Sequence, residues 1–160
     1  MATAMAEPVP HPLDSGAVDE LAALWAACGL TRPWNDPVLD ALRAIEGPSS
    51  AIIGLRDGFD ARSRLIASVM VGHDGHRGWV YYVAVAPDRR REGLGRTMMT
   101  AAEAWLRDRR APKLQLMVRD DNETAIAFYE SLGLTRQRVV TLGRFLLESP
   151  NTAPPPRSTA

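Results

Sequence analysis

The stretch from Val83 to Met99 constrains the fold more than any other part of this sequence. Residues 78–86, which lead into it, are rich in β-branched and aromatic residues, and this composition predicts a strand. Beyond a turn, apolar residues recur at helical spacing: Leu94, Met98, Ala102, Trp105 and Leu106. A strand, a turn rich in Arg and Gly, and a helix are therefore predicted in immediate succession.

The turn between this strand and this helix is suited to bind phosphate. Gly93 and Gly95 let the backbone approach a ligand closely, because they carry no Cβ. The first amides of the helix have no partner within it, and the helix dipole is positive at that end. Charge-assisted donors come from Arg90, Arg91 and Arg96. The alternative is a tight turn with a solvated cluster of arginines.

The order of residues in the turn does not match two common phosphate-binding motifs. The Gly-Lys-Ser/Thr ending of a P-loop is missing, and Met98 stands where a dinucleotide fingerprint has its third glycine. The pattern Arg90-x-x-Gly93-x-Gly95 instead resembles the pyrophosphate-binding motif of the GNAT-type N-acetyltransferases. This resemblance implies acetyl-CoA as cosubstrate, its pyrophosphate held by the amides of residues 91–96, Leu94 included.

A second signature lies downstream. Residues 113–118 predict a short strand, and a helix follows that Asp121 or Asn122 can cap and that Gly133 ends. This region resembles the second GNAT signature in its pattern Asn122-x-x-Ala125-x-x-Phe128-Tyr129-x-x-x-Gly133-Leu134. Two signatures in this order are more specific than either alone, and the resemblance runs over residues 14–147. Residues 32–37 and 142–144 further resemble the small YpeA-like bacterial branch.

The rest of the chain predicts an α/β fold, a mixed sheet with helices on both faces, in the order β-α-α-β-β-β-α-β-α-β. The first helix is expected to be capped by Asp14 or Ser15, and the second by Asp36. The second helix is expected to bury one apolar face, formed by Leu39, Leu42 and Ile45. Strands are expected over residues 7–13 (at an edge), 51–56, 65–71 and 78–86, with extended segments over 134–147.

Composition bounds the classes of function. We expect residues 7–148 to form a single domain between a flexible tail (1–6) and a disordered tail (149–160) rich in Pro, Ser and Thr. A formal net charge of zero gives no reason to expect bulk attraction to nucleic acid, and no apolar run is long enough to cross a membrane. The single cysteine, Cys28, is expected to be an inert core thiol and fits a reducing compartment, the cytoplasm. A homodimer is left open.

Acetyl transfer from a thioester to an amine needs a neutral amine, a stabilised oxyanion and a protonated leaving thiolate. The resemblance implies that the pantetheine arm runs along Val83 and Val85, where a backbone N–H polarises the thioester carbonyl. It also implies that Asn122 contacts the CoA arm and that Tyr129 is the general acid. The alternative for Tyr129 is an aromatic residue packed under the sheet.

The general base is open, because residues 79–85 lack the strand glutamate that some family members use. A water chain is one alternative, and the candidate side chains by position are Asp36, His73, Asp74 and His76. No metal is expected, since His-Asp-x-His is not a recognised ligand spacing. In this fold the acceptor amine would lie against residues 73–77 and the side chains of Trp34, Asn35, Asp36 and Tyr81. A helix cap and a core tryptophan are the alternative roles of Asp36 and Trp34.

The sequence thus predicts an acetyl-CoA-dependent N-acetyltransferase, acting on a small-molecule amine or a protein N-terminus by direct transfer in a ternary complex. The missing strand carboxylate favours an alternative, a non-catalytic acyl-CoA-binding or interaction module on the same fold. A nucleic-acid binder using residues 89–91 is disfavoured, because no binding motif accompanies these arginines.

Overall fold

The computed structural model describes residues 8–147, in which two compact units can be distinguished. The first unit contains the chain up to Leu30 and from Pro37 to Met117. The second contains Thr31–Asp36 and the chain from Val118 onward. Each unit is described by itself.

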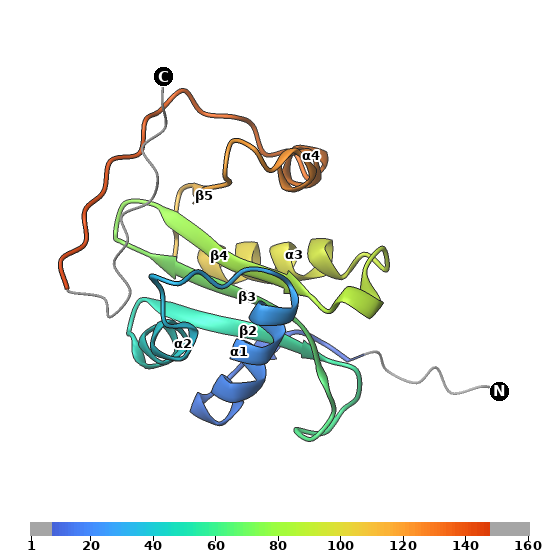
Figure 1. The fold of residues 1–160 in the computed structure, drawn as a ribbon. Helices are drawn as coiled ribbons and strands as arrows, with labels where there is room; N and C mark the ends of the chain where they lie inside the picture. Colours follow the sequence, from blue (N-terminus) through green and yellow to red (C-terminus); the bar gives the residue numbers. More distant parts are fainter. Residues whose placement is uncertain (1–7, 148–160) are drawn as a thin grey trace. The chain divides into compact units, whose positions relative to one another are not determined.

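The first unit is built on a five-stranded sheet in the order β1-β2-β3-β4-β5 (Figure 1). The first four strands pair antiparallel in sequence order, and the last runs parallel to its neighbour. The strands are β1 (His11–Pro12), β2 (Ser50–Arg56), β3 (Leu65–His73), β4 (Gly78–Val85) and β5 (Leu114–Leu116). The predicted mixed sheet is confirmed.

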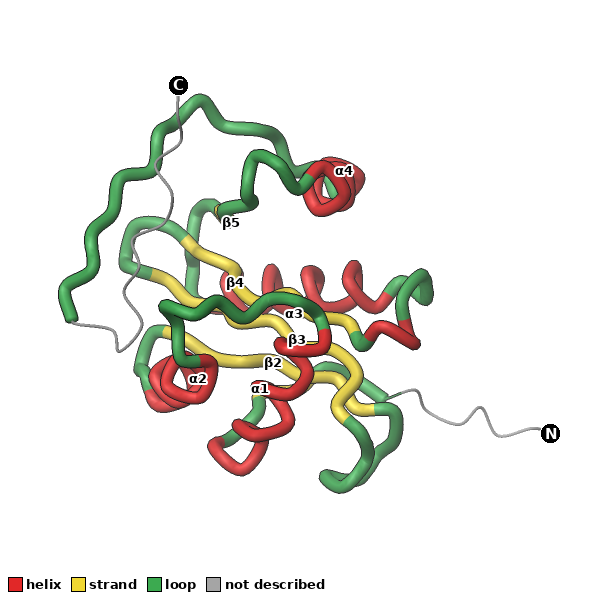
Figure 2. Tube along the Cα trace, in the orientation of Figure 1, coloured by secondary structure: helices red, strands yellow, loops and turns green. Residues whose placement is uncertain are grey.

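Helices cover both faces of this sheet, as Figure 2 shows. One face carries α1 (Val18–Ala27) and α2 (Pro37–Glu46), and the other carries α3 (Leu94–Asp108). Two short 3₁₀ turns, η1 (Ser15–Ala17) and η2 (Pro87–Arg89), lead into α1 and follow β4.

Apolar side chains from both layers of helices meet the sheet and form the core. The largest fully buried side chains are Trp25, Leu21, Ile52, Met98, Met99, Val69 and Val71. Each such side chain contributes about 1.5–3 kcal/mol by leaving water. The sheet is thereby packed on both sides.

Local signals place the start and end of α1 where the sequence predicts them. The Asp14 carboxylate accepts a hydrogen bond from the Gly16 amide at 2.9 Å and caps η1, which continues directly into α1. After α1, Gly29 adopts a φ of +69°, a left-handed conformation that ends the helix.

The second unit contains one helix, α4 (Glu123–Ser131). Of the two candidate caps the structure selects Asn122, whose Oδ1 accepts from the Ala125 amide at 3.1 Å. At the other end Gly133 has a φ of +90°, and its amide donates to the Glu130 carbonyl at 2.9 Å. Both ends of the predicted helix are therefore confirmed.

Three sequence predictions about these elements are corrected. Only residues 11–12 of the expected edge strand pair with β2, which leaves a much shorter β1. β3 extends to His73, so this histidine lies in a strand and not in a loop. Residues 134–147 form no strand, because β-branched composition favours a strand only where another strand pairs with it, and the described part of the second unit offers none.

The buried face of α2 also differs from the prediction. The fully buried residues are Ala41 and Ala44, whereas Leu39 is 46% exposed. The Ser50 hydroxyl donates to the Ala44 carbonyl at 2.9 Å, which ties this face to the start of β2. Small side chains let the helix approach its neighbours closely, and the larger Leu42 and Ile45 lie half-buried beside them.

Candidate functional site

β4 pairs with its parallel neighbour, β5, only over the first part of its length. Its paired residues are Gly78–Val80, which face Leu114–Leu116 of β5. From Tyr81 to Val85, no strand in the described residues pairs with this edge of β4. Backbone groups on such an edge are open to an extended ligand that adds to the sheet.

The same part of β4 contains a bulge. Ser68 of β3 pairs with Ala84 and Met70 with Tyr81, so β4 has one residue more than β3 between these pairs. The extra residue falls at Tyr82–Val83, where Tyr82 has a φ of +49°. A bulge bends a strand and increases its twist, which accounts for the early end of the pairing with β5.

The predicted phosphate-binding turn follows directly after this strand. Arg91 and Gly93 both adopt left-handed backbone conformations, with φ of +69° and +81°. Gly93 occupies the position before α3 and supplies no side-chain cap. The first amides of α3, those of Leu94, Gly95 and Arg96, have no carbonyl one turn earlier in the helix to donate to. Such donors suit a bound anion, and the anion cradle that the sequence predicts at this turn stays a prediction.

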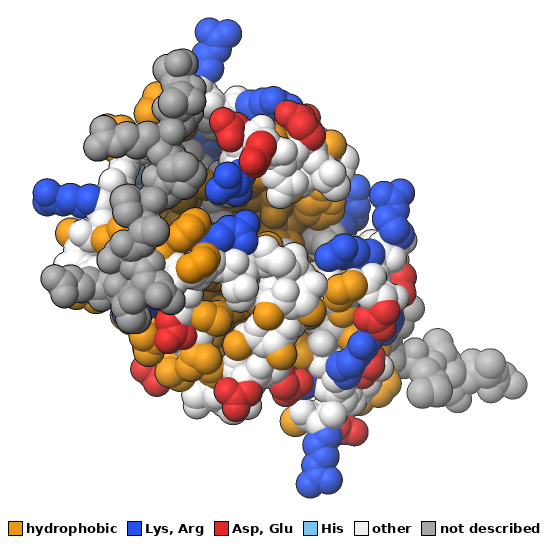
Figure 3. All heavy atoms as spheres, in the orientation of Figure 1, with side chains coloured by type: hydrophobic (Ala, Val, Ile, Leu, Met, Phe, Trp, Pro, Cys, Tyr) orange, Lys and Arg blue, Asp and Glu red, His pale blue; other side chains and the backbone are white. Residues whose placement is uncertain are grey.

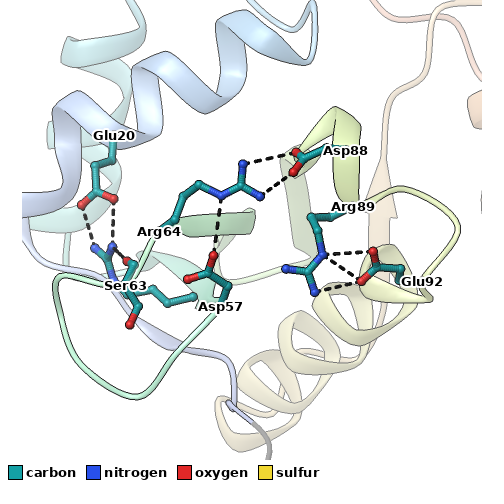
Figure 4. Close-up of polar contacts among 8 residues, drawn as sticks. Glu20, Asp57, Ser63, Arg64, Asp88, Arg89 and Glu92 are labelled. Atoms are coloured by element: carbon teal, nitrogen blue, oxygen red, sulfur yellow. Dashed lines mark hydrogen bonds and ion pairs between the residues drawn. The ribbon is translucent and has the colours of Figure 1, made fainter.

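Not all arginines of the turn are available to a phosphate. The guanidinium of Arg89 donates from Nε to both carboxylate oxygens of Glu92, at 3.0 and 2.9 Å (Figure 4). This pair neutralises the carboxylate of Glu92, which directly precedes Gly93. Among the described residues, no hydrogen bond or ion pair is found for three exposed guanidinium groups: Arg90, Arg91 and Arg96.

A further ion pair connects the turn to the loop after β2. Arg64 contacts Asp88 of η2 at 2.7 Å and Asp57 at 3.7 Å (Figure 4). Arg64 lowers the pKa of the Asp88 carboxyl. Basic side chains gather on the molecular surface at this turn, on the right of Figure 3.

The loop before β4 brings together other predicted residues. The Oδ1 atom of Asp74 accepts from the amides of His76 and Arg77 at 2.8 and 2.7 Å. Its Oδ2 accepts from the indole of Trp79 at 3.0 Å. These donors lower the pKa of Asp74 to about 2. A carboxylate held so strongly in its charged form is a poor proton acceptor.

Two other predicted residues lie on the strands that this loop joins. The ring of His73, at the end of β3, lies 6.0 Å from that of Trp105. Tyr81 is 41% exposed, and its burial, then the Asp74 charge, raise its pKa. β4 has eight residues, so at about 3.3 Å per residue this loop lies roughly 20–25 Å along the strand from the phosphate-binding turn.

Five predicted residues lie in the second unit, among them Tyr129 and three residues of the segment before α2. The rings of Tyr129 and Phe128 meet edge to face, with centroids 5.0 Å apart. Burial raises the pKa of Tyr129 to about 12. Asn35 and Asp36 are exposed and Trp34 is half-buried. Their roles as acceptor ligands, and that of Tyr129 as an acid, stay predictions.

Asn122, predicted to contact the CoA arm, also lies in the second unit. There its side-chain oxygen caps α4, and a CoA contact stays a prediction. In the first unit Val83 and Val85 are half-buried on the bulged part of β4, and the Val85 carbonyl accepts from the thiol of Cys28 at 3.2 Å. The thiol is therefore hydrogen-bonded to the backbone of the strand.

Sequence reasoning missed three side chains beside the bulge. The Tyr82 ring stacks on Trp25, with centroids 4.0 Å apart and planes 13° from parallel. The Tyr82 hydroxyl donates to Asp40 of α2 at 2.7 Å. No spacing in the sequence relates these residues, because they come from three elements and Tyr82 and Asp40 are 42 positions apart.

Two further observations concern ligands and membranes. Within residues 8–147, His, Cys, Asp and Glu side chains form no group of three or more that could hold a metal ion. In the same residues, no helix combines the length and the apolar character needed to span a bilayer.

Comparison with known proteins shows which family this chain resembles over most of its length. Residues 18–134 match the model of the acetyltransferase (GNAT) family. The chain is 39% identical over 126 residues to an acetyltransferase of Pectobacterium atrosepticum, a match covering 78% of this chain and 86% of that protein. It is 38% identical over 130 residues to an acetyltransferase of Yersinia pseudotuberculosis, covering 81% and 89%.

Solved structures resemble the fold at lower sequence identity. AAC(6′)-Iy, in complex with the bisubstrate analog CoA-S-monomethyl-acetylneamine, superposes with a TM-score of 0.72 at 11% identity, over 89% of this chain and 100% of that one. The ribosomal-protein-alanine N-acetyltransferase of Brucella melitensis biovar Abortus gives 0.68 at 20% identity, over 86% and 99%.

Proposed function

The chain belongs to the acetyltransferase (GNAT) family, which makes it an N-acetyltransferase by class, and on this premise we propose how it works. It takes acetyl-CoA and passes the acetyl group directly to a primary amine within a ternary complex. The observation that supports this most is one continuous segment of the first unit. There the bulged, half-unpaired β4 runs into an anion cradle with three unpaired arginines.

In this proposal the cradle holds the pyrophosphate of acetyl-CoA. The amides of residues 94–96 donate to its oxygens, and Arg90, Arg91 and Arg96 add charge-assisted contacts. The pantetheine arm follows the open edge of β4 along Val83 and Val85. A backbone N–H on that edge polarises the thioester carbonyl and stabilises the oxyanion that forms when the amine attacks.

Proton transfers complete the reaction. The attacking amine, with an ordinary pKa near ~10.4, must lose a proton, and the leaving thiolate, whose thiol has a pKa near ~8.5, must gain one. Tyr129 is proposed to protonate the thiolate, and its pKa of about 12 keeps the phenol protonated at neutral pH. The low pKa of Asp74 argues against this carboxylate as the base, which leaves Asp36, His73, His76 or a water chain.

The acceptor is proposed only by class. One structural relative holds an acetylneamine-derived analog and another is named for a ribosomal-protein alanine, so the fold serves both small molecules and protein N-termini. Trp34 and Asp36 are proposed to attract the cationic form of either amine. The single cysteine, Cys28, suits work in a reducing compartment, and we propose the cytoplasm.

Thermal unfolding with and without millimolar acetyl-CoA tests the cosubstrate, with ATP and NAD as controls. A ligand at about 100 times its dissociation constant stabilises a protein by ~2.7 kcal/mol, a shift of several degrees. We expect the shift with acetyl-CoA alone. An unchanged melting temperature would contradict the assignment of the cradle.

A second measurement separates the enzyme from a non-catalytic acyl-CoA-binding module. Release of free CoA thiol is followed while small amines and peptides with free N-termini are screened as acceptors. Acceptor-dependent release of thiol identifies an enzyme. Binding of acetyl-CoA without release on any acceptor would favour the module, which the lack of a carboxylate in residues 79–85 already suggests.

A further inference from the structure

We infer that Tyr82 is a positioning residue for acetyl transfer: clamped between Trp25 and Asp40, it holds the β4 bulge that presents the open strand edge to the thioester. This inference rests on the proposed function. It concerns only residues of the first unit, and Tyr82 itself is not proposed to touch a reacting atom.

The backbone of Tyr82 needs something to hold it. Its φ of +49° is uncommon for a residue other than glycine, and it is unfavourable for a bulky aromatic side chain. A strained conformation of this kind persists only where the surroundings determine it. The side chain supplies such surroundings on two sides, through Trp25 and Asp40.

The contacts around Tyr82 form a closed path through β4, α1 and β3, with a branch to α2. Tyr82 donates to Asp40 of α2 and stacks on Trp25 of α1, which is fully buried. The indole of Trp25 donates to the buried hydroxyl of Ser68 at 3.0 Å. Ser68 lies on β3 opposite Ala84, the first regular pair after the bulge. Both helices on this face of the sheet therefore fix the bulged residue against the strand pair beside it.

A second contact of α1 holds the end of the same strand. Cys28 lies three residues after Trp25, and its thiol donates to the Val85 carbonyl at 3.2 Å. Between the contacts at Tyr82 and Val85 lies the segment whose backbone is proposed to face the thioester. An oxyanion-stabilising amide must be held in place before the reaction, and these two contacts hold it from the face of the sheet that carries α1 and α2.

Four variants test the clamp. Tyr82→Phe keeps the stacked ring and removes the bond to Asp40, while Asp40→Ala removes the same bond from the other side. Tyr82→Gly accepts the positive φ without strain but removes the clamp. Asp40→Asn keeps an acceptor oxygen and is the conservative variant. The control is Asp19→Ala, which removes an exposed carboxylate from α1.

We expect kcat to fall about tenfold in Tyr82→Phe and Asp40→Ala and on the order of 100-fold in Tyr82→Gly, because small displacements in an active site cost this much. The Kd for acetyl-CoA should change by less than about threefold, since the pyrophosphate cradle is intact. Asp40→Asn should restore most of kcat, and amide exchange over residues 81–85 should quicken in the three damaging variants.

Three results would overturn the inference. The first is an unchanged kcat in both Tyr82→Phe and Tyr82→Gly, and the second is unchanged amide exchange over residues 81–85. A kcat that falls only in step with the melting temperature would also reject it, because the clamp would then only stabilise the fold. Failure of the wild type to bind acetyl-CoA would instead defeat the proposed function, and amide exchange would still decide whether Tyr82 holds the bulge.

Discussion

Gly93 shows how a single residue can serve both the fold and the ligand. Its φ of +81° lies in the left-handed region, and no atom lies within 4 Å of a Cβ added there. A substitution would thus be opposed by the backbone conformation and not by a clash. If the cradle holds pyrophosphate, that backbone conformation also aims the first amides of α3 at the ligand.

Gly93→Ala is expected to lower the free energy of unfolding by about 1–2 kcal/mol and to weaken acetyl-CoA binding markedly. The matched control is Gly29→Ala. Gly29 has a φ of +69° and equally open surroundings, and it lies outside the site. Chemical denaturation and calorimetric titration compare the two. Equal affinity for acetyl-CoA in both variants would remove Gly93 from the site.

The depressed pKa of Asp74 makes stability depend on pH. The folded state holds this carboxyl at a pKa of about 2, against an ordinary value of 3.8. The stabilisation is therefore fully present above pH ~4 and is lost as pH falls toward 2. Asp74→Asn should be less stable than wild type at pH 7, with the difference shrinking below pH 4. A difference independent of pH would contradict the bonding described for Asp74.

Tyr129 predicts a particular shape for the pH–rate profile. Because burial raises its pKa to about 12, an acid at this position stays protonated to about pH 10, and kcat should show no alkaline loss attributable to it. Tyr129→Phe should lower kcat more than acetyl-CoA affinity. An alkaline limb near pH 8 that disappears in Tyr129→Phe would contradict this assignment.

At the scale of elements, the segment from η2 to α3 contains both a carboxylate and the arginine that neutralises it. Glu92 lies beside the cradle, and Arg89 neutralises it with two hydrogen bonds. Without Arg89 a free carboxylate would face the incoming phosphates. The sequence alone shows a run of three arginines but not which of them is already engaged.

Arg89→Ala is therefore expected to weaken acetyl-CoA binding about three- to tenfold at low salt, and less at high salt because of screening. The double variant Arg89→Ala/Glu92→Ala should recover most of the affinity, since the repelling carboxylate is removed as well. Equal affinities for the single and double variants would show that Arg89 contacts the ligand itself.

At the scale of the whole molecule, the described C-terminal stretch carries apolar side chains without a strand to bury them. Six of its large apolar residues are at least 50% exposed: Val139, Val140, Leu142, Phe145, Leu146 and Leu147. So many exposed large apolar side chains within nine residues are unusual on a monomer. The homodimer considered from the sequence stays a prediction, and this stretch is where a test should begin.

We expect the chain to associate as its concentration rises through the micromolar range, and the double variant Leu142→Ser/Leu146→Ser to weaken that association. Sedimentation equilibrium measures both, with Val9→Ser, an exposed apolar residue outside the stretch, as control. A wild type that stays monomeric throughout would contradict the expectation.

The sequence by itself determined the order of elements as far as α4, the ends of α1 and α4, and the turn between β4 and α3, because these depend on local signals. Apolar periodicity, the Asp14 and Asn122 caps and the glycines Gly29, Gly93 and Gly133 act within a few residues of each other. The two GNAT signatures are local in the same sense, and the family that they indicate is confirmed.

Only the tertiary structure decided the bulge in β4, the stack of Tyr82 on Trp25 and the buried face of α2. It also showed that residues 134–147 remain without a pairing strand. These features depend on which surfaces meet, and residues far apart in the chain supply them. A residue pattern in one segment indicates which secondary structure that segment favours. Strand register, backbone strain and long-range ion pairs depend instead on the neighbours that folding brings to the segment.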